Sequence, residues 1–290
     1  MTILWPPFVG WMFFCSLLFR ILSRTRVYNF YGFVCDGVYK DLEDLQTSPK
    51  PAKYPANGVF DRTNTVWVGD VKYKDISGPD GVPDGVIDDY DKTNIGSPMP
   101  KFTFGWTNTF RYKNFDLSVF INGSYGNKVY NYLSMKLTHM NSPWTNQLNA
   151  VNGRAQLVPI NPNKVYEDGT MWYNDVSNVM VANPGASIPR ATINDPNDND
   201  RISDRYIEDG SYIRLKNISL GYTFPKKTID KLGLSNLRIY ANIQNLLTIT
   251  GYDGYDPEIG ASTSSVNVYG LDNGRYPSPT VYSFGLNVSF

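Results

Sequence analysis

The sequence predicts an all-β protein in which long antiparallel strands form part of a transmembrane β-barrel with long loops. The first observation is a set of runs, each of roughly ten residues, in which apolar and polar side chains alternate. The second is that long segments rich in Asn, Asp, Pro and Gly separate several of these runs, and the third is that the chain ends on such a run. Strands of this length cross a bilayer, whereas strands of a soluble sandwich have about five or six residues.

The first two alternating runs predict a hairpin. In "KFTFGWTNTFRY" and "FDLSVFINGSYG" the apolar residues fall on every second position, and only Lys113 and Asn114 separate the runs. A short polar link between two alternating runs is typical of an antiparallel hairpin.

Three further runs follow. "SYIRLKNISLGYTFP" changes the parity of its apolar residues at Asn217, which predicts a bulge or a strand end at that point. "LRIYANIQNLL" keeps a constant parity. The terminal run would place on lipid the five residues Tyr282, Phe284, Leu286, Val288 and Phe290. No charge lies on that face, where an Arg or Lys at mid-membrane would cost about 2–4 kcal/mol.

The composition excludes several classes of function. The 27 basic and 27 acidic side chains cancel, and no basic run points to nucleic acid. Two cysteines, Cys15 and Cys35, form neither a disulfide framework nor a metal-binding spacing. The single histidine, His139, leaves no site with several histidines. Since no catalytic motif appears either, we expect no enzyme.

Residues 1–26 differ from the rest of the chain. They are nearly all apolar up to Phe19, and the arginines follow the apolar run, whereas a signal peptide carries its positive charge first. A membrane helix and a segment from a shifted reading frame both remain open, because the run is short and contains Pro6 and Pro7.

Several long motifs resemble the late region of the SusC/RagA family of TonB-dependent outer-membrane transporters of Bacteroidetes. They are "GDVKYKDISGPDGVPDGVIDDYDKTNIGSPMPKFTFGWTNTFRYKNFDLSVFINGSYGNKVYN", "SDRYIEDGSYIRLKNISLGYTFP", "LRIYANIQNLLTITGYDGYDPEIG" and "SPTVYSFGLNVSF". The segment "YNFYGFVCDGVYK" is similar to the stretch that introduces this region in the family. The resemblance covers nearly all of residues 27–290 in the expected order.

The resemblance implies a role and a cellular place. It implies a C-terminal, incomplete barrel portion of an importer in the cell outer membrane, with about five to eight long strands and long extracellular loops. Residues 27–100 would be an extracellular loop region and 101–290 strands and long loops. It also implies uptake of a glycan or peptide with a SusD-like lipoprotein, energised by the TonB complex. The plug and the TonB-contacting segment of the family have no counterpart before Val27. The terminal strand would be the signal for the outer-membrane assembly machinery.

An acidic, glycine-containing segment raises the question of calcium. Read as a twelve-residue calcium loop, it would use as ligands Asp80, Asp84, Asp88 and Asp91. Position 3 is Val82, which has no side-chain oxygen, although Asp75 could replace it in an irregular loop. A solvated turn built on Asp-Gly chemistry is the alternative.

The long loops contain an acidic cluster and a set of aromatic residues. The acidic cluster between Asp195 and Asp209 contains Arg201 and Arg205, and we expect it to be a locally neutralised, solvated loop. Aromatic residues in the long loops are candidates for contact with substrate or with a lid protein, namely Trp144, Trp172, Tyr173, Tyr252 and Tyr255. A soluble or surface-attached all-β carbohydrate-binding module with calcium-stiffened loops is the alternative to the transporter, and strand length distinguishes the two.

Overall fold

The computed structural model describes residues 28–51, 58–258 and 269–290, so the apolar segment 1–26 lies outside the described residues. The chain forms two units. The loop unit comprises the described residues of Met1–Gly96 and Tyr130–Ile207, and the sheet unit those of Ser97–Val129 and Glu208–Phe290. The long segment Tyr130–Ile207 thus belongs to the same unit as the amino-terminal part of the chain. In the described ranges no helix has the length and apolar character needed to span a membrane.

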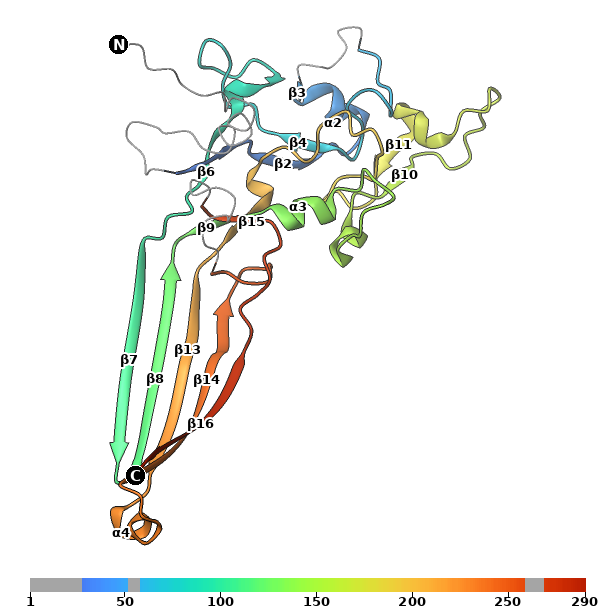
Figure 1. The fold of residues 1–290 in the computed structure, drawn as a ribbon. Helices are drawn as coiled ribbons and strands as arrows, with labels where there is room; N and C mark the ends of the chain where they lie inside the picture. The colour runs from blue at the N-terminus through green and yellow to red at the C-terminus, as the bar shows by residue number, and fades with distance from the viewer. Residues whose placement is uncertain (1–27, 52–57, 259–268) are drawn as a thin grey trace, which may run out of the picture. The chain divides into compact units, whose positions relative to one another are not determined.

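The sheet unit is built on one five-stranded antiparallel sheet (Figure 1). Its order is β16-β14-β13-β8-β7, and the two edges are β16 and β7. The strands have 9 to 15 residues: β7 (Phe102–Tyr112), β8 (Phe115–Tyr125), β13 (Tyr212–Thr223), β14 (Asn236–Thr250) and β16 (Val281–Ser289). All five alternating runs are therefore strands, as predicted.

The register of these strands places the apolar residues on one face. Leu220 of β13 lies opposite Leu117 of β8 and Ala241 of β14, and Ala241 lies opposite Phe284 of β16. Directly paired residues of antiparallel strands share a face. The other face carries the small and polar residues, for example Ser219 opposite Ser118 and Asn242.

The predicted irregularity near Asn217 is a bulge, not a strand end. Leu215 and Asn217 pair with consecutive residues of β8, Ile121 and Phe120, so Lys216 is the extra residue. The bulge returns Leu215 to the apolar face although its parity in the sequence has changed. Lys216 instead donates a hydrogen bond of 2.7 Å to Glu258.

The connections at one end of the sheet are short. Lys113, with φ of 53°, and Asn114 join β7 to β8, while α4 (Lys226–Ile229) and the 3-10 helix η6 (Asp230–Leu232) join β13 to β14. The carboxyl terminus lies beside this second turn, where Ser235 N–H donates to the carbonyl oxygen of Ser289 at 2.8 Å. At the other end, residues 126–211 connect β8 to β13, and the described residues 251–258 and 269–280 belong to the long connection between β14 and β16, as the sequence predicted.

A charged pair crosses the polar face of the sheet. Arg238 of β14 donates from Nε and Nη2 to the carboxylate of Asp116 of β8, at 3.1 and 2.6 Å. The strand between them, β13, carries Gly221 beneath the pair, and a Cβ there would lie 2.3 Å from Arg238 Nη2 and 2.6 Å from Asp116 Oδ1. Glycine leaves the room that this pair occupies.

The loop unit consists of small sheets, short helices and long connections. Its two-stranded sheets are β1-β6 (Phe30–Gly32, Thr93–Gly96), β2-β4 (Cys35–Val38, Val71–Tyr73), β3-β5 (Lys50–Pro51, Val86–Ile87) and β10-β11 (Leu157–Pro159, Val179–Val181). Its helices are α2 (Leu42–Thr47), α3 (Tyr132–Thr138) and the 3-10 helices η1 (Asp89–Asp91), η2 (Asn149–Gly153), η3 (Trp172–Asn174), η4 (Val176–Asn178) and η5 (Asp204–Tyr206). A separate three-stranded sheet has the order β12-β9-β15 (Ile207–Asp209, Lys128–Asn131, Leu271–Asp272), and most of its residues belong to the sheet unit.

The core of the loop unit collects around one tryptophan. Trp67 is fully buried, and it clusters with Val38, Tyr39, Leu45 and Val179, among others. These residues come from α2, β2 and β11 and from the connections between them, so side-chain burial joins elements that have few ladder hydrogen bonds.

Trp67 provides a test of this packing. We expect Trp67→Ala to lower the free energy of unfolding of the loop unit by about 3–5 kcal/mol, because a fully buried ring is replaced by a cavity. Trp67→Phe should cost far less, since it keeps an aromatic ring and removes an indole N–H that has no hydrogen-bond partner in the described part of the chain. Urea-dependent limited proteolysis of the purified protein measures both, and equal stability of the two variants would contradict the packing.

Candidate functional site

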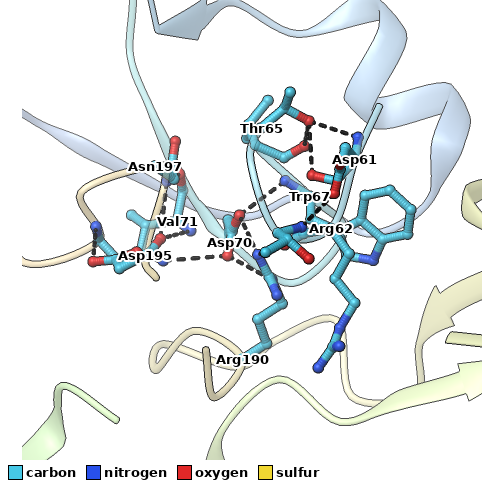
Figure 2. Close-up of polar contacts among 12 residues, drawn as sticks. Asp61, Arg62, Thr65, Trp67, Asp70, Val71, Arg190, Asp195 and Asn197 are labelled. Atoms are coloured by element: carbon cyan, nitrogen blue, oxygen red, sulfur yellow. Dashed lines mark hydrogen bonds and ion pairs between the residues drawn. The ribbon is translucent and has the colours of Figure 1, made fainter. Parts of the chain in front are cut away.

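A buried turn forms the centre of the polar part of the loop unit (Figure 2). Asp70 N–H donates to Trp67 C=O at 3.0 Å, and Trp67 N–H donates to Asp70 Oδ2 at 2.8 Å. Gly69, third in the turn, has φ of 88°, which is the conformation that a type II turn requires at that position. The turn therefore directs a fully buried carboxylate into the protein.

Arg190 is the main partner of this carboxylate. Its Nε and Nη2 donate to the two oxygens of Asp70, at 2.8 and 3.1 Å, and Nη2 also donates to Arg62 C=O at 3.2 Å. Burial raises the pKa of Asp70, while the guanidinium of Arg190 and the hydrogen bonds from Trp67 and Asn199 act in the opposite direction. The pair has little access to water, because Arg190 is only 3% exposed.

Two asparagines extend the network away from Asp70. Asn199 Nδ2 donates to Asp70 Oδ1 at 3.2 Å and to Asp195 Oδ1 at 2.5 Å, and Asn199 Oδ1 accepts from Val71 N–H at 2.7 Å. Asn197 Nδ2 donates to Val71 C=O at 2.9 Å. The prediction of a solvated acidic loop is wrong for this part of the segment, since Asp195, Asn197 and Asn199 are all buried, and the two asparagines make hydrogen bonds to Asp70 and Val71.

His139 lies between two carboxylates of the same segment. Its Nε2 is 2.6 Å from Asp195 Oδ2, and its Nδ1 is 3.4 Å from Asp200 Oδ2. These three side chains are the described group whose ligand atoms lie within 4.8 Å of one another. The oxygens of Asp195 already accept N–H groups of Asn199, so we interpret the group as a buried polar contact instead of a metal centre.

The network fixes both ends of a short exposed segment. Ala191–Asn194 runs between Arg190, paired with Asp70, and Asp195, in contact with His139. Thr192 N–H also donates to Met140 C=O at 3.2 Å. The segment and Met140 border two adjoining cavities of about 360 and 470 Å³, which share Met140, Ala191 and Ile193. Further residues of the two cavities include Arg62, Thr63 and Asn194 in one and Gln147, Asn152 and Arg154 in the other.

The predicted aromatic residues have different environments. Trp144 is 93% exposed and Tyr255 is 65% exposed. Trp172 and Tyr173 form an edge-on pair with ring centroids 5.6 Å apart, and Trp172 packs against the core of the loop unit. Tyr252 is buried, and its hydroxyl donates to Asp272 at 2.5 Å, so its predicted contact with substrate or a lid is not supported.

The predicted calcium ligands do not converge as proposed. Asp91 is fully buried and accepts N–H groups of Ile76 and Asp88 at 2.8 Å, while Asp88 Oδ1 accepts Tyr90 N–H at the start of η1. Asp80 is exposed. The carboxylate with acidic neighbours is Asp75, which accepts Gly85 N–H through Oδ2, while its buried Oδ1 has no hydrogen-bond partner among the described residues.

The pKa of Asp75 reports on its neighbours. Burial raises it, the hydrogen bond from Gly85 lowers it, and the negative charges of Asp91 and Asp84 raise it further. Asp84 and Asp91 therefore lie close enough to Asp75 for their charges to act on its carboxylate.

An ionic cluster in the sheet unit involves the bulge. Arg214 of β13 is nearly fully buried; it donates to Asp256 and, at 2.6 Å, to Glu258, which Lys216 also contacts. Burial raises the pKa of Asp256, but the hydrogen bonds from Arg214 and from the N–H groups of Ser278 and Glu258 outweigh it and lower the pKa overall. The cluster ties the long loop after β14 to the sheet.

Comparison with known proteins shows that this chain is similar to TonB-dependent receptors. No protein-family model matches it. It is 32% identical over 267 residues to TonB-dependent receptor P3 of Formosa agariphila, covering 90% of this chain and 22% of that receptor. It is 29% identical over 209 residues to TonB-dependent receptor SusC of Bacteroides thetaiotaomicron, covering 71% of this chain and 17% of SusC. The chain thus spans less than a quarter of the length of these relatives.

A solved structure has the same fold. The RagAB peptide importer in the "open-open" state matches 98% of this chain and 25% of that chain, with a TM-score of 0.56 and 17% sequence identity. At this identity the likeness concerns the fold. The predicted fold class, an incomplete antiparallel barrel portion with long loops, is confirmed.

The contribution of the buried pair Asp70–Arg190 to stability can be tested by mutation. We expect Asp70→Ala to destabilise the loop unit by about 3–5 kcal/mol, because it leaves the buried guanidinium of Arg190 unpaired. The double variant Asp70→Ala with Arg190→Ala should be more stable than the sum of the two single variants implies. Proteolysis in urea measures the cycle, and strictly additive effects would show that the pair has no coupling.

Proposed function

Because this chain is a relative of the SusC/RagA type of TonB-dependent receptors, as its sequence motifs indicated, we propose that it forms barrel wall and loop surface of an outer-membrane nutrient importer. In this proposal the sheet unit is the lipid-facing wall and the loop unit is the surface that meets cargo. The cargo is an oligosaccharide or a peptide, captured with a SusD-like lipoprotein and released inward by TonB-driven movement of a plug. The names of the relatives, a SusC receptor and the RagAB peptide importer, support this choice.

The observation that carries the proposal is the exposed apolar face of the five-stranded sheet. Trp106, Leu220, Ile239 and Phe284 of four different strands are 45% to 84% exposed on that face. A soluble sandwich would bury such a face against a second sheet. A bilayer accommodates it, because a strand of eleven residues tilted by about 45° spans roughly the 25 Å of an outer-membrane apolar band.

The open edges support the same placement. Strands β7 and β16 have a partner on one side only in the described sheet. Within a bilayer their free N–H and C=O groups require further strands, as in a closed barrel. The terminal residues Tyr282 to Phe290 would then act both as an edge that joins the rest of the barrel and as the signal for the assembly machinery.

The loop unit carries exposed aromatic side chains suited to cargo or to a lid protein. Trp144 is the most exposed of them, and Trp172 with Tyr173 offers a pair of rings. Large aromatic side chains bury much area at low entropic cost, which suits a recognition surface.

We also propose a calcium ion for the acidic segment, with a revised set of ligands. Asp75 and Asp84 would hold the ion together with backbone oxygens of the segment, because Asp75 Oδ1 has no hydrogen-bond partner in the described part of the chain and the negative charges of Asp91 and Asp84 raise the pKa of Asp75. Carboxylate oxygens are the ligands that Ca²⁺ prefers. The ion would supply positive charge beside Asp75 and Asp84, and it would fix the connection between β4 and η1.

Calcium binding is directly measurable. We expect Ca²⁺ to raise the thermal unfolding temperature of the purified protein, since a ligand of the folded state stabilises it. Asp75→Asn and Asp84→Asn should abolish this shift and the binding heat in calorimetry, whereas Asp80→Asn, an exposed position in the same segment, should leave both unchanged. Loss of binding in Asp80→Asn alone would instead favour the regular twelve-residue loop predicted from the sequence.

The lipid-facing role of the sheet is tested on adjacent residues. We expect Leu220→Arg, on the apolar face of β13, to lower folding stability in lipid vesicles by up to about 2–4 kcal/mol, because the charge faces hydrocarbon. Ser219→Arg, on the opposite face of the same strand, should cost much less. Urea titration of the refolded protein in vesicles measures both. Similar losses in the two variants would argue for a sheet buried in protein.

A further inference from the structure

The two adjoining cavities of the loop unit have a rigid common wall. Ala191–Asn194 is held at both ends by buried polar contacts, through Arg190 with Asp70 and through Asp195 with His139. The hydrogen bond between Thr192 and Met140 holds its middle. A loop positioned by a fixed scaffold is a common platform for binding, because little ordering entropy remains to be lost.

Each cavity is lined by one arginine. The guanidinium carbon of Arg62 lies 4.9 Å from the centre of the Tyr173 ring, and its buried Nε has no hydrogen-bond partner in the ranges that the structure describes. Arg154 is fixed through its backbone, since its C=O accepts from Asn183 at 2.9 Å, and its Nη1 makes one long contact of 3.4 Å with Val151 C=O. Both guanidinium groups therefore keep donors for a ligand.

The charge at this place is unbalanced. No residue lining either cavity is acidic, and neither arginine forms an ion pair with a described carboxylate. The residues that the structure does not describe contain no Asp or Glu. Two arginines without a carboxylate in the chain attract an anion, and the planar guanidinium matches a carboxylate in two-point contact.

The remaining lining residues favour a peptide over a sugar. Met140, Val151, Ala191 and Ile193 are aliphatic, and no aromatic ring lines either cavity. Sugar rings bind through stacking on aromatic faces, whereas aliphatic side chains of a peptide fit an aliphatic wall with a few polar groups.

We propose that these cavities bind short acidic peptides, with Arg62 and Arg154 each holding a carboxylate and the Met140–Ile193 wall contacting aliphatic side chains. The proposal rests on the import function proposed above and specifies its cargo. Asn152, Thr63 and Asn194 would provide hydrogen bonds to the peptide backbone.

The test uses blocked tetrapeptides that differ only in charge. Acetyl-Leu-Glu-Val-Glu-amide and its isosteric relative acetyl-Leu-Gln-Val-Gln-amide have the same shape and apolar content, and trigalacturonate supplies carboxylates on a sugar. Calorimetry on the purified protein should show that the Glu peptide binds roughly tenfold or more tightly than the Gln peptide at low salt. The preference should shrink at high salt, because exposed charges are screened.

The variants separate the arginines from overall charge. Arg62→Gln and Arg154→Gln should each weaken binding of the Glu peptide about tenfold and change binding of the Gln peptide little. Arg62→Lys should recover part of the loss, since it keeps the charge but not the two-point geometry. Lys74→Gln removes a positive charge from an exposed residue of the same unit outside both cavities and should have no effect. Unchanged unfolding temperatures confirm that the variants are folded.

Three outcomes would overturn the site: equal binding of the two peptides, unchanged binding in both arginine variants, or binding of trigalacturonate without binding of the Glu peptide. Uptake by cells separates this result from the import function. If cells import the Glu and Gln peptides equally, import stands and the acidic preference fails. If the purified protein binds the Glu peptide through the arginines but cells import neither, the site stands and import fails.

Discussion

The carboxylate of Asp70 is the point on which the loop unit depends. It receives hydrogen bonds from Trp67 in its own turn, from Arg190 and from Asn199, residues separated from it by 120 and 129 positions. Closing loops of that length is entropically costly, and short two-stranded sheets supply few hydrogen bonds to offset the cost. Burial of the Trp67 ring excludes water from the turn, and the low dielectric strengthens each of these contacts. Apolar and polar parts of the core thus depend on each other.

The same contact also determines where binding surface can exist. Arg190 and Asp195, on either side of Ala191–Asn194, make buried contacts with Asp70 and His139. The segment between them therefore has a defined position although its side chains face solvent. Arg62 is linked to this system through its own carbonyl, which accepts a hydrogen bond from Arg190. The Ala191–Asn194 segment and Arg62 are therefore both held by Arg190. Loss of the Asp70 contact would disturb recognition and folding together.

The sheet was predictable from the sequence, and the network was not. Each strand is predictable from its own residues, because a period of two is visible within about ten residues. The change of parity at Asn217 likewise predicted a bulge or a strand end, and the structure shows a bulge. The polar run containing Asn197 and Asn199 has the composition of a solvated loop, and nothing near it indicates that its partners are Asp70 and Val71. Arg62 and Arg154 were missed for a related reason. A single arginine in a loop has no local pattern, and its lack of a carboxylate partner is a property of the folded chain.

The Asp116–Arg238 pair has a consequence for how the sheet can form. Its members belong to β8 and β14, which are not neighbours, so the pair relates two strands across the intervening β13. A ladder of backbone hydrogen bonds tolerates displacement by two residues, since such a shift restores the same faces. The charged pair does not tolerate it, because the shift would carry Arg238 along the sheet away from Asp116 and away from the gap above Gly221. One side-chain contact therefore selects two registers at once, that of β13 against β8 and that of β14 against β13.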